Sequence, residues 1–210
     1  MRTIQVEQIT EAVANMCKEA CYYLPQDVYD ALVKGKETEE SPLGRDVLDQ
    51  IIRNADIARS EDRPICQDTG MTVVFMEIGQ DVQFAGGNLI DAVNAGVAKG
   101  YIEGYLRKSV VAEPLFDRKN TTNNTPAVIY TDIVPGDKLK IKLAPKGFGS
   151  ENKSALKMLV PADGIEGVKK VVLDTVIHAG ENPCPPIVVG VGIGGTMDKA
   201  AVLSKKALLR

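Results

Sequence analysis

The residues best suited to chemistry stand together at positions 66–70, which read Cys-Gln-Asp-Thr-Gly. This stretch combines a soft thiolate ligand, an amide, a carboxylate and a flexible glycine. An apolar run follows directly at 71–76 and predicts a buried strand. The polar cluster therefore lies where a loop enters a strand, and a rigid element there can hold side chains in a fixed direction.

A second cysteine, Cys184, lies within residues 182–186 (Asn-Pro-Cys-Pro-Pro), just before an apolar run at 187–193 that also predicts a strand. Two cysteines, each at the start of a strand, suggest that both thiols contribute to one site. The alternative is that Cys66 and Cys184 are both buried thiols that pack as small apolar side chains. Spacing alone does not separate these interpretations.

Two glycine-containing segments are further candidates for ligand binding. Residues 147–154 read Gly-Phe-Gly-Ser-Glu-Asn-Lys-Ser, so glycines that allow close backbone approach precede hydrogen-bonding side chains. The alternative there is a simple turn into a helix capped by Ser150. Residues 190–196 form a glycine-rich turn before a predicted helix, which is a natural anion site. Their match to the dinucleotide fingerprint lacks the following strand and its acidic residue.

Three other residues of types that could take part in chemistry have structural explanations. Cys17 and Cys21 lie four residues apart, on one face of a predicted helix. A metal could bridge them, but no His or acidic residue joins them in a ligand spacing, so we predict two small core residues. His178, the only histidine, falls in the last turn of a predicted helix, where a cation suits the helix dipole.

The elements that position these groups alternate between helices and strands. Apolar periodicity predicts helices over residues 4–24, 26–36, 88–103, 163–179 and 197–209, and one more that starts at Ser41-Pro42. Strands are predicted at 127–134 and 138–143, joined as a hairpin near a sheet edge, after a polar loop at 119–126. We expect an α/β fold of α+β type, with small mixed or antiparallel sheets packed with several helices, in a single domain over residues 1–210.

Composition excludes several classes of protein. The 210 residues include 44% hydrophobic and 25% charged residues, as is typical of a soluble globular protein. The net charge of -3 and the lack of a basic block argue against nucleic-acid binding. No apolar run is long enough to span a bilayer, and no signal-peptide pattern is present. Four cysteines are too few for a disulfide framework, so we expect reduced thiols and a cytoplasmic location.

In combination, the segments at 66–70, 147–153, 182–186 and 190–196 resemble class I fumarate hydratase, in the form of the alpha subunit of the two-subunit enzyme. The resemblance covers nearly the whole chain. It implies an iron–sulfur hydro-lyase of the tricarboxylic acid cycle that interconverts fumarate and (S)-malate. Alpha subunits of L-tartrate dehydratase belong to the same superfamily, so L-tartrate is the alternative substrate.

The resemblance also implies a [4Fe-4S] cluster held by three cysteines, with one iron open to the substrate. Cys66 and Cys184 match two of these ligands. The third family cysteine lies in a later Asn-Cys-His segment that this sequence does not contain, and Cys17 and Cys21 match no family ligand. The chain also ends where the family continues, so we interpret it as a shortened alpha subunit.

The remaining roles follow from the same resemblance. Asp68 is the candidate group for moving a proton at the substrate hydroxyl, and the opposing base comes from the beta subunit. A small dicarboxylate needs cationic and N–H donors, and the resemblance assigns these to Gln67, Arg107, Gly149, Asn152 and Lys153. We expect Cys66, Cys184 and all of these groups to border one electropositive cavity.

The expected partner is the beta subunit, in a heterotetramer or another oligomer, and we expect the isolated chain to be inactive. Two alternatives remain. The chain is a non-catalytic assembly or interaction module, or it is a nucleotide-binding domain that uses Gly190 to Gly195.

Overall fold

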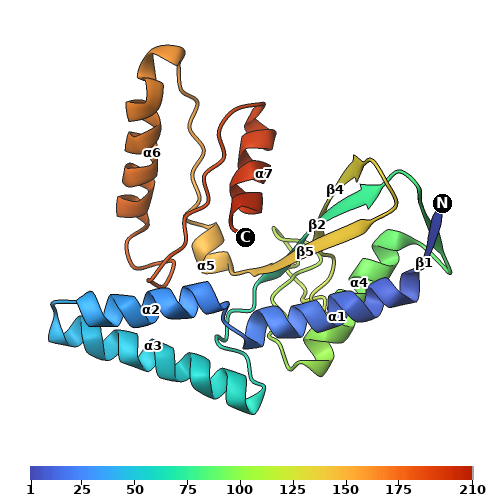
Figure 1. Cartoon of the computed structure of the whole chain (residues 1–210), viewed down its shortest axis with the longest axis horizontal. Helices are drawn as coiled ribbons and strands as arrows, with labels where there is room; N and C mark the ends of the chain where they lie inside the picture. The colour runs from blue at the N-terminus through green and yellow to red at the C-terminus, as the bar shows by residue number, and fades with distance from the viewer. Residues whose placement is uncertain (210) are drawn as a thin grey trace. The chain divides into compact units, whose positions relative to one another are not determined.

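The computed structural model describes residues 1–209, which form two compact units, Met1–Pro145 and a second that begins at Lys146 (Figure 1). The fold is of the mixed α/β class, with helices and small sheets, as the sequence predicts. Among the described residues, no helix has both the length and the apolar character needed to cross a membrane.

Two helices form the framework of the first unit: α1 (Val6–Tyr22) and α4 (Leu89–Glu103), which pack side by side (Figure 1). Their contact is close because α4 presents glycines to α1. A Cβ atom at Gly96 would lie 2.6 Å from the Thr10 carbonyl oxygen, and one at Gly100 would lie 2.7 Å from that of Ala14. The small residues of this segment therefore serve helix packing.

A pair of helices precedes the predicted site: α2 (Gln26–Thr38) and α3 (Pro42–Glu61). The start of α3 is as predicted, because Ser41 is its N-cap, Pro42 its first residue, and the Ser41 hydroxyl accepts the Gly44 N–H at 3.3 Å. The helix ends at Asp62, which adopts the left-handed conformation. This turn directs the chain into the segment that contains Cys66.

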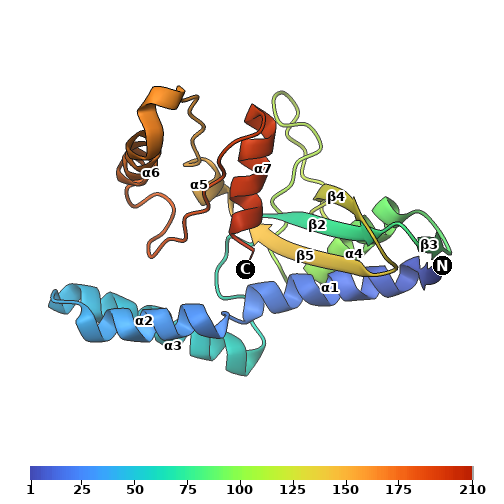
Figure 2. The same ribbon diagram turned by 45° about the horizontal axis from the view of Figure 1, so that its top comes forward.

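Two small sheets complete the first unit. Strand β1 (Arg2–Gln5) pairs in parallel with β3 (Val82–Ala85). In the second sheet, β2 (Met71–Gly79) lies between β4 (Val128–Val134) and β5 (Leu139–Lys146). Strand β2 is parallel to β4, and β5 runs in the opposite direction (Figure 2).

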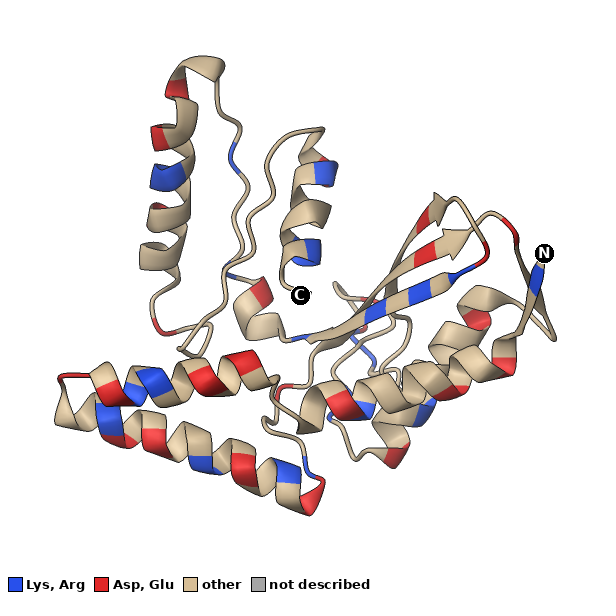
Figure 3. Ribbon diagram, viewed as in Figure 1, with Lys and Arg blue, Asp and Glu red and all other residues tan. Residues whose placement is uncertain are grey.

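The predicted hairpin of β4 and β5 is wrong, because β2 separates the two strands. The turn at 135–137 instead crosses the end of β2. There the Gly79 N–H donates to the Lys138 carbonyl and the Gln80 N–H to that of Val134, each at 2.8 Å. Strand β2 takes the central place because its residues are apolar on both faces, and Phe75 on one face and Met76 on the other are both buried. Lysines recur along β5 at the sheet edge (Figure 3).

The second unit contains the one-turn helix α5 (Phe148–Glu151), a 3₁₀ turn (Pro161–Asp163), α6 (Gly164–Ala179) and α7 (Met197–Ala207). The strand predicted at 187–193 is wrong, since this segment has no regular structure. The physical reason is its glycines. A Cβ atom at Gly190 would collide with the Ser204 carbonyl oxygen, and one at Gly192 with that of Ala200. The segment therefore packs its bare backbone against α7 and pairs with no strand.

Candidate active site

A cavity of about 620 Å³ opens in the first unit around the predicted cluster. Cys66, Gln67 and Thr69 border it from the loop before β2, and Arg107 borders it from the segment after α4. The other lining residues are Tyr22, Asp62, Arg63, Pro64, Gly104 and Tyr105. Three residues singled out from the sequence, Cys66, Gln67 and Arg107, are thus together in one concave site that is large enough for a small metabolite.

Buried side chains fix the loop that carries Cys66. The Thr69 hydroxyl donates to the Arg107 carbonyl at 2.9 Å, and the Tyr101 hydroxyl donates to the Thr69 carbonyl at 2.5 Å. Thr69 and Tyr101 are both buried, and burial raises the pKa of the Tyr101 hydroxyl above its usual value, so this donor keeps its proton. The two sides of the cavity, the Cys66 loop and the Arg107 segment, are therefore tied together directly.

Asn124 makes a second tie between the same two segments. Its amide nitrogen donates to the Gly70 carbonyl at 3.0 Å, and its amide oxygen accepts the N–H groups of Ser109 (2.7 Å) and Val110 (3.2 Å). The side chain is fully buried, and the backbone has a φ of 62°, a conformation that Asn tolerates better than most residues. Sequence analysis missed this residue because it stands in a polar loop among other Asn and Thr residues. A single Asn before a Thr-Pro pair is too weak a signal to find it.

The four thiols differ sharply in environment. Cys66 and Cys184 are exposed, so the interpretation of both as buried packing residues is wrong. Cys17 and Cys21 are buried, as predicted, and burial raises the pKa of each thiol to about 12. They therefore stay protonated near neutral pH, whereas metal ligation requires thiolates.

The Cys66 sulfur lies among polar groups of its own loop. The Asp68 N–H points at the sulfur at 3.4 Å, and the thiol donates to the Gln67 side-chain oxygen at 3.3 Å. The half-buried Asp68 turns one carboxylate oxygen to the Gly70 N–H at 3.2 Å, so Asp68 lies beside the residues that line the cavity.

The charged groups that line the cavity are two guanidinium groups and one carboxylate. Arg107 and Arg63 supply the positive charges and Asp62 the negative one. Asp62 accepts the Tyr23 hydroxyl at 2.5 Å, and Arg63 pairs with Glu61 at 2.9 Å. The lining therefore carries one net positive charge, as a site for an anionic ligand requires.

The second unit brings two other predicted segments together. A Cβ atom at Gly149 would lie 3.5 Å from the Asn182 carbonyl oxygen, so the turn at 147–153 contacts the segment that contains Cys184. Gly147, not Ser150, is the N-cap of α5, so the predicted cap is wrong. Asn152 and Lys153 follow α5 directly, and their N–H groups donate back to Phe148 (3.0 Å) and Ser150 (3.1 Å).

The Cys184 segment is held by bonds within its own turn. The Cys184 N–H donates to the Glu181 carbonyl at 3.0 Å, with Cys184 at a positive φ of 58°. The Asn182 side chain donates to the Ala179 carbonyl at 3.0 Å. Among residues 1–209, no group of three or more His, Cys, Asp or Glu side chains is placed to hold a metal ion.

The glycine-rich segment does not form a dinucleotide site of the predicted kind. No strand precedes it, and Gly190 and Gly192 face α7, as described above. Only Gly194 and Gly195, at φ values of 84° and 75°, form the turn into the helix.

Comparison with known proteins identifies close relatives over nearly the whole chain. The family model described as fumarate hydratase (Fumerase) matches residues 10–210. A Methanocaldococcus jannaschii protein, provisionally named L(+)-tartrate dehydratase subunit alpha, is 45% identical over 208 residues, which are 97% of this chain and 73% of that relative. The L(+)-tartrate dehydratase subunit alpha of Escherichia coli O157:H7 is 37% identical over 210 residues, 98% of this chain and 68% of that relative.

Proposed function

Because this chain belongs to the fumarate hydratase (Fumerase) family of hydro-lyases, we propose that it is the alpha subunit of an iron–sulfur enzyme that adds water to, or removes it from, a four-carbon dicarboxylate. The cavity lined by Cys66, Gln67 and Arg107 is the observation that carries this proposal. A thiol, an amide and a guanidinium group that can bind a carboxylate in a bidentate manner thus line the same cavity.

The thiols of the chain fit the cofactor in part. Cys66 and Cys184 are exposed and would hold a [4Fe-4S] cluster, whereas the protonated thiols of Cys17 and Cys21 lie in the core. When bound, such a cluster supplies an open iron that acts as a Lewis acid toward the substrate hydroxyl. The proposal assigns Cys66 and Cys184 as two of the cluster ligands and the third ligand to no residue of this chain.

The substrate carboxylates are bound by this chain's own donors. Arg107 offers two parallel N–H groups to one carboxylate, and Gln67 adds an amide donor in the same cavity. We assign the second carboxylate to the turn of the second unit, with Gly149, Asn152 and Lys153 as donors. Asp68, next to Gln67, holds or moves the proton at the departing or entering hydroxyl.

Two substrates are compatible with these donors, fumarate/(S)-malate and L(+)-tartrate. The family description favours the first, and the names of the relatives favour the second. (S)-Malate and L(+)-tartrate both carry two carboxylates and a hydroxyl on a carbon next to a carboxylate, and tartrate carries a second hydroxyl next to the other, so the same residues serve either. A direct comparison of turnover on (S)-malate and L(+)-tartrate decides between them.

The partner in this proposal is a beta-type subunit that supplies the opposing base, since the relatives are named as alpha subunits. We expect the assembly, a heterotetramer or another oligomer, to work in the cytoplasm, where thiols stay reduced. The isolated chain is then inactive, and we expect turnover to return only when both the beta-type subunit and the segment with the third cysteine ligand are supplied anaerobically. If the assembled complex binds no iron and has no turnover, the chain is instead an assembly module.

The decisive experiment measures iron, acid-labile sulfide and visible absorbance in the anaerobically purified complex. We expect Cys66→Ala and Cys184→Ala each to lose most of the cluster, because each removes a thiolate ligand. The matched control is Cys21→Ala, which removes a buried thiol and should keep the iron. Full iron content in the Cys66→Ala complex would refute the metal assignment.

The substrate assignment is tested separately with Arg107→Met. Loss of a bidentate, charge-assisted contact should lower kcat/KM about 100-fold, while iron content stays unchanged. Arg53→Met removes an exposed arginine of α3 outside the cavity and serves as the control. Equal kinetics in the two variants would remove Arg107 from the site.

A further inference from the structure

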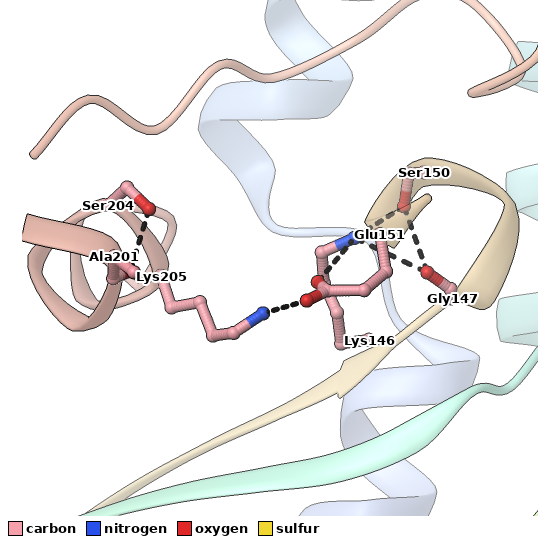
Figure 4. Close-up of polar contacts among 7 residues, drawn as sticks. All are labelled: Lys146, Gly147, Ser150, Glu151, Ala201, Ser204 and Lys205. Carbon is pink, nitrogen blue, oxygen red and sulfur yellow. Dashed lines mark hydrogen bonds and ion pairs between the residues drawn. The ribbon is translucent and has the colours of Figure 1, made fainter. Parts of the chain in front are cut away.

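Glu151 lies between two lysines in the second unit (Figure 4). One carboxylate oxygen bonds the Lys205 ammonium of α7, and the other lies 3.7 Å from the Lys146 ammonium. The three side chains are partly shielded from water, with exposed fractions of 17% for Lys146, 23% for Lys205 and 35% for Glu151. Partly buried ions of this kind interact more strongly than ions on an open surface.

The same cluster closes the start of α5. The Lys146 ammonium donates to the Ser150 hydroxyl at 2.5 Å and to the Gly147 carbonyl at 3.3 Å. The Ser150 hydroxyl in turn donates to the Gly147 carbonyl at 3.1 Å. Lys146 therefore holds Gly147, the N-cap of α5. Glu151, the last residue of α5, connects this helix to α7 (Figure 4).

These ties matter because α5 has only four residues. A helix this short is not stable by itself, because the conformational entropy lost in nucleation exceeds the stabilisation from one turn of hydrogen bonds. The side chains of the turn, Phe148 included, are at most half-buried, so apolar packing alone does not fix its geometry. The ions at Lys146, Glu151 and Lys205 are thus the contacts that set where Gly149, Asn152 and Lys153 point.

We infer that Glu151 is a positioning residue for the substrate-binding turn. Through Lys146 and Lys205 it holds the Gly149 backbone and the side chains of Asn152 and Lys153 in the geometry that accepts a carboxylate. The inference rests on the proposed function, which assigns one substrate carboxylate to this turn. It adds that α7 takes part in substrate affinity through Lys205, although no α7 residue is assigned a contact with the substrate.

The first test is hydrogen exchange of the Asn152 and Lys153 amides in the complex with the beta-type subunit, which reports on the turn whether or not the enzyme is active. Glu151→Gln keeps the size of the side chain but removes the negative charge between the two ammonium groups. We expect both amides to exchange about tenfold faster, because the turn opens locally. Unchanged exchange would overturn the inference.

The second test separates substrate affinity from chemistry. Glu151→Gln should raise KM about tenfold and leave kcat within about twofold, since the reacting groups are elsewhere. Lys205→Met should reproduce both effects, and Lys205→Arg should restore normal values by keeping the charge. The control is Asp174→Asn, which breaks the exposed Lys170–Asp174 pair of α6 (2.9 Å) and should change neither exchange nor KM.

The outcomes distinguish this inference from the proposed function. Faster exchange with an unchanged KM would overturn the positioning role for substrate. If the wild-type complex turns over neither (S)-malate nor L(+)-tartrate, the proposed function fails, and the exchange of Asn152 and Lys153 still decides whether Glu151 holds the turn. If Asp174→Asn changed amide exchange and KM as much as Glu151→Gln does, the effect would reflect a general destabilisation of the second unit. That result would overturn the inference as well.

Discussion

The two cysteine-bearing loops of this chain are held in different ways. Around Cys66, buried side chains from distant segments bind the loop backbone, with Tyr101 at the Thr69 carbonyl and Asn124 at the Gly70 carbonyl. Around Cys184, the hydrogen bonds stay within the turn itself and end at Glu181 and Ala179. The first loop therefore depends on the core of its unit, and the second on local bonds.

The same difference extends to the two units. The first has a continuous apolar core built from α1, α4 and β2, in which Val13, Val74 and Val97 are fully buried. In the described part of the second unit, Ala179 is the only buried apolar residue, and large apolar side chains such as Ile165, Ile177 and Ile193 are exposed. Burial thus sets the cavity of the first unit, whereas hydrogen bonds and ion pairs set the turn at 147–153 in the second.

The largest change in stability that tests this contrast between the two loops is expected from Asn124→Ala. The change removes three hydrogen bonds and leaves Ala at a φ of 62°. At roughly 1 kcal/mol for each bond and about 1 kcal/mol for the strained backbone, we expect a loss of about 4 kcal/mol in the free energy of unfolding. Urea unfolding followed by tyrosine fluorescence measures it, because all six tyrosines lie in the first unit and the chain has no Trp.

The matched control for this variant is Asn123→Ala, which removes a half-buried loop neighbour whose side-chain oxygen accepts the N–H and the hydroxyl of Thr125. At the same rate of roughly 1 kcal/mol for each bond, we expect its cost to be about 2 kcal/mol, half that of Asn124→Ala. Equal costs for the two variants would mean that Asn124 does not tie the Cys66 loop to the Arg107 segment.

The next effect is a loss of stability at alkaline pH. Cys17 and Cys21 have a folded-state pKa of about 12 and an ordinary value of 9.0. Because the folded pKa is the higher one, the stability is fully present below pH 9 and is lost as pH rises toward 12. Between pH 8 and pH 10 the two thiols should cost roughly 2 to 3 kcal/mol together. Far-UV circular dichroism in urea measures this, and a Cys17→Ala, Cys21→Ala double variant should show a weaker pH dependence.

A smaller effect is expected from filling the contact between α1 and α4. A Cβ atom at Gly100 would lie 2.7 Å from the Ala14 carbonyl oxygen and 2.9 Å from the Cys17 Cβ. Gly100→Ala should therefore cost about 2 kcal/mol through overpacking. Gly192→Ala makes a similar collision with α7, but it should leave the tyrosine-detected transition of the first unit unchanged. A shared loss in both variants would show that the two units unfold together.

The sequence predicts those parts of the fold that local patterns specify. The helix that begins at Pro42 follows from its Ser-Pro start, and the burial of Cys17 follows from apolar spacing. The central strand at Met71 follows from an uninterrupted apolar run. Each of these signals resides in neighbouring residues, so no knowledge of distant contacts is needed.

The failures concern contacts between distant segments. Strands β4 and β5 are separated by only a short turn, yet both pair with β2, because an apolar central strand needs partners on both edges. The run at 187–193 is apolar, but its glycines favour packing on α7. For the site, the Cys66 cluster is evident from residue types, whereas Asn124 and Glu151 act through partners that the sequence does not reveal.

The smallest expected effect tests the local character of the Cys184 loop. Asn182→Ala removes one hydrogen bond to the Ala179 carbonyl, but the Asn182 backbone N–H still donates to the same carbonyl at 3.2 Å. No buried group is left unpaired, so the cost should be about 0.5 kcal/mol. The measurement is hydrogen exchange at the Cys184 amide, which donates to Glu181. A change as large as that of Asn124→Ala would mean that Cys184, like Cys66, depends on a buried network, and the contrast between the two loops would not hold.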